Sequence, residues 1–461
     1  MRASRVWMLI ASLFFIGAAW GANVGRMAVP ERRGDQTARV DRGWYGSLPL
    51  DPSAAAEAYL ARIPTEMRLR GEAYSRTRLI AFGLEVLTVL VATGIFCASG
   101  LAGHMRDLAA RLTGRPFLKN LLVALLYFVA LYAISMPSEV YGQYVRPHRA
   151  GFSDQSFAAW LGDDLTNWSV LTAFYLVAVV TIYELIRWRP RRWVGWAIGL
   201  YVVLRAIYTF ASPTVIEPLT NRFRPLAEGP QRQLILALAR ANGIREAAVV
   251  VGDASRQSRV LNAHVSGFGA TARISVDDTT LASTSTEMLS AVVAHEIGHF
   301  VLSHEVLWVV SDSLIMAAGL LLIAVGMRLF VGRFGSRWHI LGIGDIASLP
   351  VFWALFVLWG FAALPLSNAV ARAYERQADL FGLNASRAPH GMAEFMIHDA
   401  DIARLQPTRL EYALFYTHPS DVERVRTAMQ WRAEMAGAGP PALDLSGRHP
   451  RCDPAGEAGR P

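Results

Sequence analysis

The pattern His-Glu-Ile-Gly-His at residues 295–299 combines residue types that can bind a metal and move a proton. On a helix, residues four apart share one face, so His295 and His299 can both reach one Zn²⁺ ion. Glu296 can act as the general base toward water at that metal. The alternative is an ordinary helix on which two of the chain's 11 histidines fall by chance. The pattern predicts a catalytic zinc site that still lacks a ligand.

A catalytic zinc needs a third protein ligand and leaves its fourth position to water or substrate. The downstream segment NAVARAYERQADLF offers Glu375 and, four residues later, Asp379. We expect Glu375 to bind the metal and Asp379 to accept the free ring N–H of a ligating histidine. Taken alone, such a pair is usually a solvated helical face. Here it directly follows an apolar stretch, so a membrane would hold the two ligand-bearing helices side by side.

The histidines should lie on one helix over residues 284–305, which Thr284 and Glu287 can open with a capping box. Other expected elements are a helix over 229–244, a strand over 247–253, a hairpin over 261–278, and helices near Ala54–Arg70, Ser367–Leu383, His390–Leu405 and Ser420–Ala436.

Seven apolar stretches are long enough to consider as transmembrane helices, which need roughly 20 residues each. Hydrophobic residues make up 53% of the chain and tryptophans number 13, so the composition indicates a membrane protein rather than a soluble one. The stretches are Val6–Trp20, Leu79–Leu101, Leu118–Met136, Trp168–Ile186, Trp193–Ala211, Val306–Val331 and Leu349–Val370. We expect the first, which is the shortest, to be an uncleaved anchor, and a cleaved signal peptide is the alternative.

Three charged residues fall inside these stretches: Glu85, Arg205 and Asp312. An unpaired charge there costs at least ~3 kcal/mol. Either the charges form ion pairs between helices, or the helices line a water-filled cavity, and both interpretations stay open.

The net charge of +8 comes almost wholly from arginine, since Lys119 is the single lysine. No aromatic-interleaved basic patch accompanies it, so nucleic-acid binding is not expected. The two cysteines, Cys97 and Cys452, cannot form a disulfide framework.

The predicted fold class is mainly α: a multi-pass membrane protein with about seven transmembrane helices and a metalloprotease domain with a small β-sheet. The expected units are an N-terminal anchor or signal and loop (1–75), membrane helices two to five (76–212), a catalytic loop (213–304), membrane helices six and seven (305–371), C-terminal catalytic helices (372–436) and a disordered tail (437–461).

Several segments together resemble the type I CAAX prenyl endopeptidases, which are integral-membrane zinc metalloproteases. They are HEIGHFVLSH, YERQADLF, LNAHVSGFG, THPSDVERV, HRAGFSDQSFAAWLGD and IEPLTNRFRPLAEGPQR. The resemblance covers roughly residues 75–435. It implies a zincin-like domain whose membrane helices enclose a large chamber.

The resemblance implies one zinc per chain, bound by His295, His299 and Glu375, with Glu296 as base and Asp379 behind a ligand. It also implies that Asn262 and Ala263 lie on an edge strand that pairs with substrate. It implies that His418, with Arg424, faces the oxyanion. From the residues alone, Asn262 reads equally as a turn residue, His418 as a loop histidine and Arg424 as solvated. His304 is interpreted as structural.

Short-loop arginines give the expected orientation. They fall before the first stretch and on its side of the membrane: Arg2, Arg5, Arg106, Arg111, Arg115, Arg187, Arg189, Arg191, Arg192, Arg333 and Arg337. The positive-inside rule makes that side cytoplasmic and puts the catalytic side in a periplasm, opposite to the family's cytosolic face. A bacterial inner membrane is the expected location.

The expected function is a membrane zinc endopeptidase acting on membrane-associated or unfolded proteins. The expected partners are a peptide or protein substrate and the lipid bilayer, and the oligomeric state is not predicted. Two alternatives are a non-catalytic membrane scaffold or chaperone, which missing ligands would favour, and a transporter, which inverted repeats would favour. Neither feature is seen in the sequence.

Overall fold

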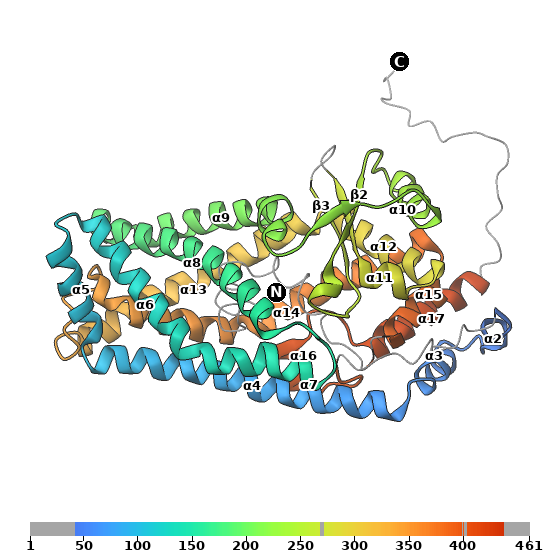
Figure 1. The fold of residues 1–461 in the computed structure, drawn as a ribbon, viewed down its shortest axis with the longest axis horizontal. Coiled ribbons are helices and arrows are strands. Elements are labelled where there is room, and N and C mark those ends of the chain that lie inside the picture. Colours follow the sequence, from blue (N-terminus) through green and yellow to red (C-terminus); the bar gives the residue numbers. More distant parts are fainter. Residues whose placement is uncertain (1–41, 268–271, 399, 401–402, 438–461) are drawn as a thin grey trace, which may run out of the picture.

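The structure, a computed structural model, describes residues 42–267, 272–398, 400 and 403–437. Within these residues, six helices are long and apolar enough to cross a membrane. They run along the long axis of the molecule, and the sheet stands toward one end of them (Figure 1). Their bounds are α4 Thr65–Ala98, α6 Pro116–Glu139, α8 Phe157–Trp188, α9 Trp193–Ala211, α13 His304–Phe334 and α14 Leu349–Ser386.

These six helices match the second to seventh apolar stretches predicted from the sequence, except that α4 ends at Ala98, three residues before the predicted end of the second stretch at Leu101. The first, Val6–Trp20, lies outside the described residues. The mainly helical fold class is therefore confirmed, and the small sheet appears where the hairpin was expected.

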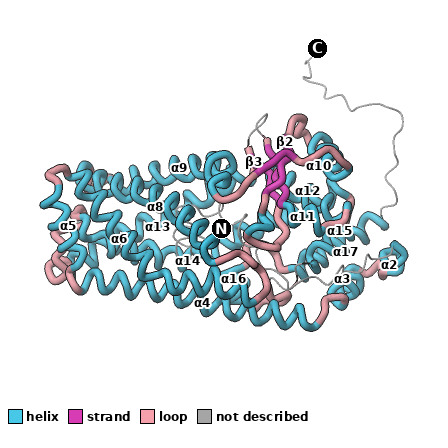
Figure 2. The backbone as a smooth tube through the Cα atoms, viewed as in Figure 1, coloured by secondary structure: helices cyan, strands magenta, loops and turns pink. Residues whose placement is uncertain are grey.

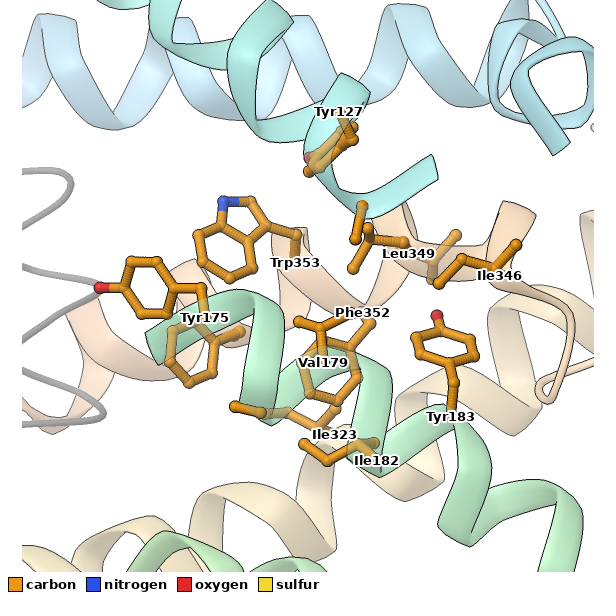
Figure 3. Packing of buried hydrophobic residues seen from close by; sticks show 14 of the residues in the cluster. Tyr127, Tyr175, Val179, Ile182, Tyr183, Ile323, Ile346, Leu349, Phe352 and Trp353 are labelled. Carbon is orange, nitrogen blue, oxygen red and sulfur yellow. The ribbon is translucent and has the colours of Figure 1, made fainter. Parts of the chain in front are cut away.

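The interior of the bundle is built from aromatic and branched side chains of all six helices, and Figure 3 shows part of it, where α6, α8, α13 and α14 meet. Trp353 of α14 packs edge-to-face against Phe128 and Tyr175, with ring centroids 4.8 and 5.3 Å apart. The opposite faces of the helices expose large apolar side chains such as Leu314 (68%) and Leu322 (57%). A helix that is apolar on both its packed face and its exposed face is what a lipid environment requires.

The sheet has four strands in the order β1-β2-β4-β3. They are β1 Phe223–Pro225, β2 Ala248–Gly252, β3 Ala263–Ser266 and β4 Arg273–Asp277. β2 and β4 are parallel, and the other two pairs are antiparallel, so β3 is an edge strand. Figure 2 shows the strands grouped beside α12, among helices. Apolar residues from the sheet, from α10 Pro230–Ala241 and from α12 Thr286–Val301 form one core.

The helix that carries the two histidines begins and ends differently from the prediction: the expected single helix over residues 284–305 is wrong, because α12 ends at Val301 and the left-handed Ser303 separates it from α13. The N-cap of α12 is Ser285, whose side chain accepts the backbone N–H of Met288, and not Thr284. Thr284 instead donates its hydroxyl to the carbonyl of Thr280, at the end of α11 Asp278–Ser283. The expected Thr284–Glu287 capping box is therefore wrong by one residue, because two hydroxyl residues stand side by side and either can cap a helix.

The predicted helix over Ala54–Arg70 is two helices. α3 (Pro52–Ala61) ends before Pro64, and α4 starts at Thr65 and continues into the membrane. Proline has no N–H to donate, so it interrupts the helical hydrogen bonds and serves here as the residue that precedes α4.

The predicted helix near Ser367–Leu383 is the end of α14 and not a separate element. Of the predicted helix His390–Leu405, the structure has α15, Pro389–His398. The predicted helix near Ser420–Ala436 is confirmed as α17, Asp421–Gly437. The remaining helices are α2 Arg42–Ser47, α5 Leu101–Leu112, α7 Arg146–Arg149, α16 Arg409–Phe415, and five short π or 3-10 turns: Val140–Val145, Ser212–Ile216, Glu217–Leu219, Ala254–Arg256 and Ile346–Ser348.

The N-terminal helices α2 and α3 pack on α15 and α17, so they cover the C-terminal part of the chain. The Tyr59 hydroxyl lies 2.6 Å from Nδ1 of His390, whose ring stacks on Tyr45 at 4.2 Å. Arg62 forms an ion pair with Glu394. These contacts tie residues 42–63 to helices that follow the sixth membrane span of the described chain.

Candidate metal centre

The two helices that carry the predicted ligands, α12 and α14, approach each other closely where glycines face a neighbour. A Cβ atom at Gly382 would lie 3.0 Å from the backbone nitrogen of His295, and one at Gly298 would lie 3.1 Å from the ring of Phe381. Without these side chains the helix backbones can lie close enough to bring His295, His299 and Glu375 together. Glu375 lies on the same continuous helix as the membrane-spanning part of α14, so its position relative to the membrane follows from the length of that part.

Three buried acceptor atoms converge between α12 and α14. His295 Nε2 lies 3.1 Å from His299 Nε2 and 3.2 Å from Glu375 Oε2, and His299 Nε2 lies 3.6 Å from that oxygen. A tetrahedral zinc with ligand bonds of about 2.0–2.1 Å has ligand atoms separated by roughly 3.3 Å, so the three separations fit such an ion. Among the described residues, these three form the group arranged to hold a metal.

Glu375 Oε2 also fits a cation at this place. The oxygen is buried, no hydrogen bond of good geometry reaches it from the described part of the chain, and its nearest polar neighbours are ring nitrogens of His295 and His418, 3.2 and 3.1 Å away. A buried carboxylate costs free energy unless a positive charge, from a metal ion or a protonated histidine, neutralises it. The donor set of two imidazoles and one carboxylate is the set that catalytic zinc uses.

Behind His295, Asp379 and Arg424 form a buried pair. Asp379 Oδ1 lies 2.9 Å from His295 Nδ1, the ring nitrogen that points away from the converging atoms. Arg424 of α17 donates from Nε to Asp379 Oδ2 over 2.9 Å and from Nη2 to Oδ1. Burial acts to lower the pKa of Arg424, but the charge of Asp379 outweighs it and raises that pKa. Asp379 therefore lies beside His295, as predicted, and Arg424 holds Asp379 from the other side.

Behind His299 lies His304, whose Nδ1 is 2.9 Å from His299 Nδ1. His304 Nε2 is in turn 3.2 Å from Oε1 of Gln377 on α14. Sequence reasoning interpreted His304 as structural and did not select Gln377. The signal was present in the extended pattern HEIGHFVLSH, but helical spacing does not bring residue 304 to the outer nitrogen of residue 299.

Glu296 lies beside the cluster, with Oε1 4.0 Å from His295 Nε2. Burial raises the pKa of the Glu296 carboxyl, and the two neighbouring histidines oppose that rise. A carboxylate in such a position can reach a water molecule held at the converging atoms, which is the geometry a general base needs.

His418 approaches the cluster from the loop between α16 and α17. Its Nε2 lies 3.1 Å from Glu375 Oε2, and its Nδ1 lies 3.0 Å from the hydroxyl of Thr417. Burial lowers the pKa of His418 to about 4. Arg372 of α14 donates to the carbonyls of Tyr412 and Tyr416 over 3.0 and 2.6 Å and so holds this loop against α14.

Asn262 and Ala263 lie at the start of the edge strand. Ala263 pairs with Val276 of β4, while the carbonyl of Asn262 accepts the backbone N–H of Asp277 over 3.0 Å. The Thr280 hydroxyl is 2.7 Å from the Asn262 backbone N–H and 2.9 Å from its carbonyl. The Ala263 side chain enters the core shared with α12, so the strand is anchored to the histidine-bearing helix.

The charged residues within the spans have two arrangements. Arg205 of α9 donates from Nε and Nη2 to Asp312 of α13 over 3.1 and 3.0 Å, and both side chains are buried. For this pair, the interpretation as an ion pair between helices is confirmed. Glu85 of α4 is also buried, next to the position where a side chain at Gly142 would lie.

Two family models match the chain. One, described as peptidase family M48, matches residues 225–432, and the other, the CAAX prenyl protease N-terminal region with five membrane helices, matches residues 54–222. The first covers β2, β3, β4 and the converging side chains, and the second covers the membrane helices before them.

Curated proteins and a solved structure are similar to the same regions. The chain is 30% identical over 280 residues to YhfN of Bacillus subtilis, described as an uncharacterized metalloprotease. The aligned region covers 60% of this chain and 65% of that protein. It is 30% identical over 305 residues to a CAAX prenyl protease 1 homologue of Oryza sativa subsp. japonica, which is 63% of this chain and 68% of that protein. The crystal structure of Ste24p from S. mikatae has the same fold, with a TM-score of 0.65 and 18% identity over 92% of this chain and 99% of that chain.

Proposed function

The chain is a multi-pass membrane protein that belongs to peptidase family M48, a metalloprotease family, and we propose that it is an active endopeptidase with one zinc ion per chain. The observation that carries this proposal is the convergence of His295 Nε2, His299 Nε2 and the buried Glu375 Oε2. A scaffold or chaperone that had lost catalysis would have no reason to keep all three ligands and Glu296 in place.

When bound, zinc at this site supplies a Lewis acid that polarises the scissile carbonyl and makes nearby water more acidic. Glu296 takes a proton from the attacking water and returns it to the departing amine. Burial supports this role because it raises the pKa of the Glu296 carboxyl, as a general base requires.

His418 faces the carbonyl oxygen as negative charge develops on it. If Nδ1 accepts a hydrogen bond from the Thr417 hydroxyl, the proton of neutral His418 lies on Nε2, the nitrogen near Glu375. Neutral imidazole can then donate to the oxyanion. We assign Arg424 to a different task from the one first expected, because its donors are directed at Asp379: it holds that carboxylate against His295.

In this proposal an extended substrate peptide pairs with the edge strand β3 and so becomes a further strand of the sheet. β3 pairs with β4 on one side, and its first residues, Asn262 and Ala263, are joined through Thr280 and the shared core to α12. Edge strands recognise extended peptide by backbone hydrogen bonds, so unfolded or membrane-associated segments are the substrate class. The chain spans about two thirds of the length of these curated relatives.

We further propose a bacterial inner membrane with the catalytic side in the periplasm. The short-loop arginines support this orientation, since they gather on the side opposite the metal-binding residues. The six-part division of the chain predicted from the sequence is retained in this proposal, with residues 372–436 as its C-terminal catalytic unit.

The deciding experiment is metal analysis of the purified full-length protein, together with cleavage of a fluorogenic peptide library before and after treatment with a chelator. We expect one zinc per chain, and cleavage that is lost with the metal and restored by added Zn²⁺. Protein that holds stoichiometric zinc but cleaves nothing would favour a non-catalytic role. Protein that purifies without zinc and does not take it up would overturn the proposal.

A further inference from the structure

We propose that His304 and Gln377 are positioning residues for the metal site: they hold His299 in the tautomer and ring orientation that presents Nε2 to the metal. This inference rests on the proposed zinc site and deepens it. It concerns the outer nitrogen of His299, where the structure has a second histidine and an amide in place of the carboxylate found behind His295.

The proton positions on His299 and His304 follow from assigning one donor and one acceptor to each contact in the series His299–His304–Gln377. A histidine that binds a metal through Nε2 carries its proton on Nδ1. The Nδ1 of His299 lies 2.9 Å from Nδ1 of His304, so His299 donates and His304 accepts. The proton of neutral His304 is then on Nε2, which lies 3.2 Å from Gln377 Oε1, an acceptor. With His304 neutral and Gln377 Oε1 accepting, every contact has one donor and one acceptor when His299 Nε2 is free for the metal.

The rings in this chain are held by stacking. His299 stacks on Trp308 with centroids 5.3 Å apart and planes 22° apart, and His304 stacks on Tyr374 at 5.0 Å and 22°. His304 is fully buried. These contacts limit rotation of both rings, so the hydrogen bond between them can set which nitrogen of His299 is protonated.

The turn between α12 and α13 brings His304 to this place. α12 ends at Val301, and Ser303 adopts the left-handed conformation (φ 56°), which a non-glycine residue seldom does, before α13 begins at His304. His304 therefore belongs to the next helix and returns toward His299 from its far side. The sequence separation of five would not give this contact on a continuous helix.

The two ligating histidines thus have different supports. The carboxylate of Asp379 makes His295 a more basic ligand, as charged partners of metal-bound histidines do. His304 is a neutral acceptor and adds no negative charge behind His299. Zinc held by these residues would keep more of its positive charge than between two carboxylate-supported histidines, which would favour polarisation of a carbonyl.

The test measures zinc affinity of the full-length protein by competition with chelators of known affinity. His304→Phe keeps a ring for Tyr374 to stack on but has no acceptor, and we expect it to bind zinc roughly 10–100-fold more weakly. His304→Asn places an acceptor oxygen near the position of Nδ1, and we expect it to restore most of the affinity. His104→Phe, a change of the same kind on the exposed face of α5, serves as control and should not alter affinity.

A purely structural role is separated from this proposal by two further measurements. The melting temperature of the metal-free protein should be lower for His304→Asn, which loses the ring stacked on Tyr374, than for His304→Phe, yet His304→Asn should bind zinc more tightly, the reverse of what a purely structural role requires. In the Co²⁺-loaded protein the visible absorption of His304→Phe should shift while that of His304→Asn should not. If His304→Phe binds zinc as tightly as wild type, the inference is overturned while the zinc site itself stands.

Gln377 provides a second test if His304→Phe does not fold. Its side chain is exposed, so substitutions there are tolerated more readily. Gln377→Glu keeps an acceptor for His304 Nε2 and should bind zinc at least as tightly as wild type, whereas Gln377→Leu should bind it several-fold more weakly. Equal affinity of the two variants would overturn the role of the chain of contacts.

Discussion

Gly382 of α14 lies directly against the backbone of His295 on α12. A Cβ atom at position 382 would be 3.0 Å from the nitrogen, 3.1 Å from the Cα and 3.3 Å from the Cβ of His295. Backbone atoms cannot turn aside as a flexible side chain can. The absence of a side chain at residue 382 therefore sets how closely the helix that carries Glu375 approaches the helix that carries both histidines.

We expect Gly382→Ala to separate the two helices and weaken zinc binding by about tenfold or more, with a loss of stability on the order of 1–3 kcal/mol from overpacking. Gly298→Ala should cost less, because its obstacle is the ring of Phe381. Gly83→Ala on α4 meets no atom within 4 Å and is the control, since replacing glycine in a helix there should stabilise slightly. Zinc affinity and melting temperature are measured together. Unchanged affinity in Gly382→Ala would show that the helices can part without cost.

Removal of a ligand should remove the metal. His295→Ala is expected to abolish both bound zinc and peptide cleavage, since two remaining ligands hold zinc weakly. Metal content per chain and cleavage rate are the two readouts. Stoichiometric zinc in a His295→Ala, His299→Ala double variant would mean that the ion is held elsewhere.

Glu296→Gln should separate metal binding from catalysis. The amide keeps the size of the side chain but cannot accept the proton of the attacking water. We expect zinc content to match wild type and cleavage to fall by at least two to four orders of magnitude. Cleavage near the wild-type rate would exclude Glu296 as the base.

The orientation prediction is tested with reporters fused after Ala436, at the end of the described chain. A reporter active only in the periplasm should give signal, and one active only in the cytoplasm should not, because the short-loop arginines lie on the other side. The reverse pattern would give the active site a cytosolic face and redirect the search for substrates to cytoplasmic proteins. Cleavage of the first apolar stretch would not change the catalytic side.

Docking of the N-terminal helices should depend on pH through His390. Burial lowers the pKa of this histidine to about 4, against about 6.5 in an unfolded chain. The unfolded state therefore gains a proton first as pH falls, and stability is lost progressively between about pH 6.5 and 4. His390→Asn removes this titration, so the melting temperature of wild type should fall more steeply across that window than that of the variant. Parallel curves would contradict the assignment.

The convergence of His295, His299 and Glu375 could be predicted because their positions follow local rules. His295 and His299 are four residues apart on one helix, and Glu375 follows an apolar stretch whose helix simply continues. The supports behind the ligands could not be predicted in the same way. Arg424 reaches Asp379 across 45 positions, and His304 reaches His299 through a left-handed residue whose conformation nothing in its side chain requires.

The helix boundaries show the same limit at smaller scale. Thr284 and Ser285 are both suited to cap a helix, and their types alone do not say that Ser285 is the residue that does so. Pro64 was a visible breaker inside a stretch with favourable spacing, and its lack of an N–H outweighed the apolar pattern on either side.

Because α14 is continuous from the membrane-spanning part to Glu375, its length sets the position of Glu375 relative to the membrane. From Leu349 to Glu375 the helix rises about 39 Å at 1.5 Å per residue, more than the ~30 Å of a hydrocarbon core. No loop separates the lipid-embedded turns from the turn that bears the ligand. One residue inserted anywhere along that length would rotate the Glu375 carboxylate by about 100° about the helix axis, away from the histidines. The number of residues in the membrane-spanning part of α14 therefore sets the direction in which Glu375 faces, in addition to anchoring the chain.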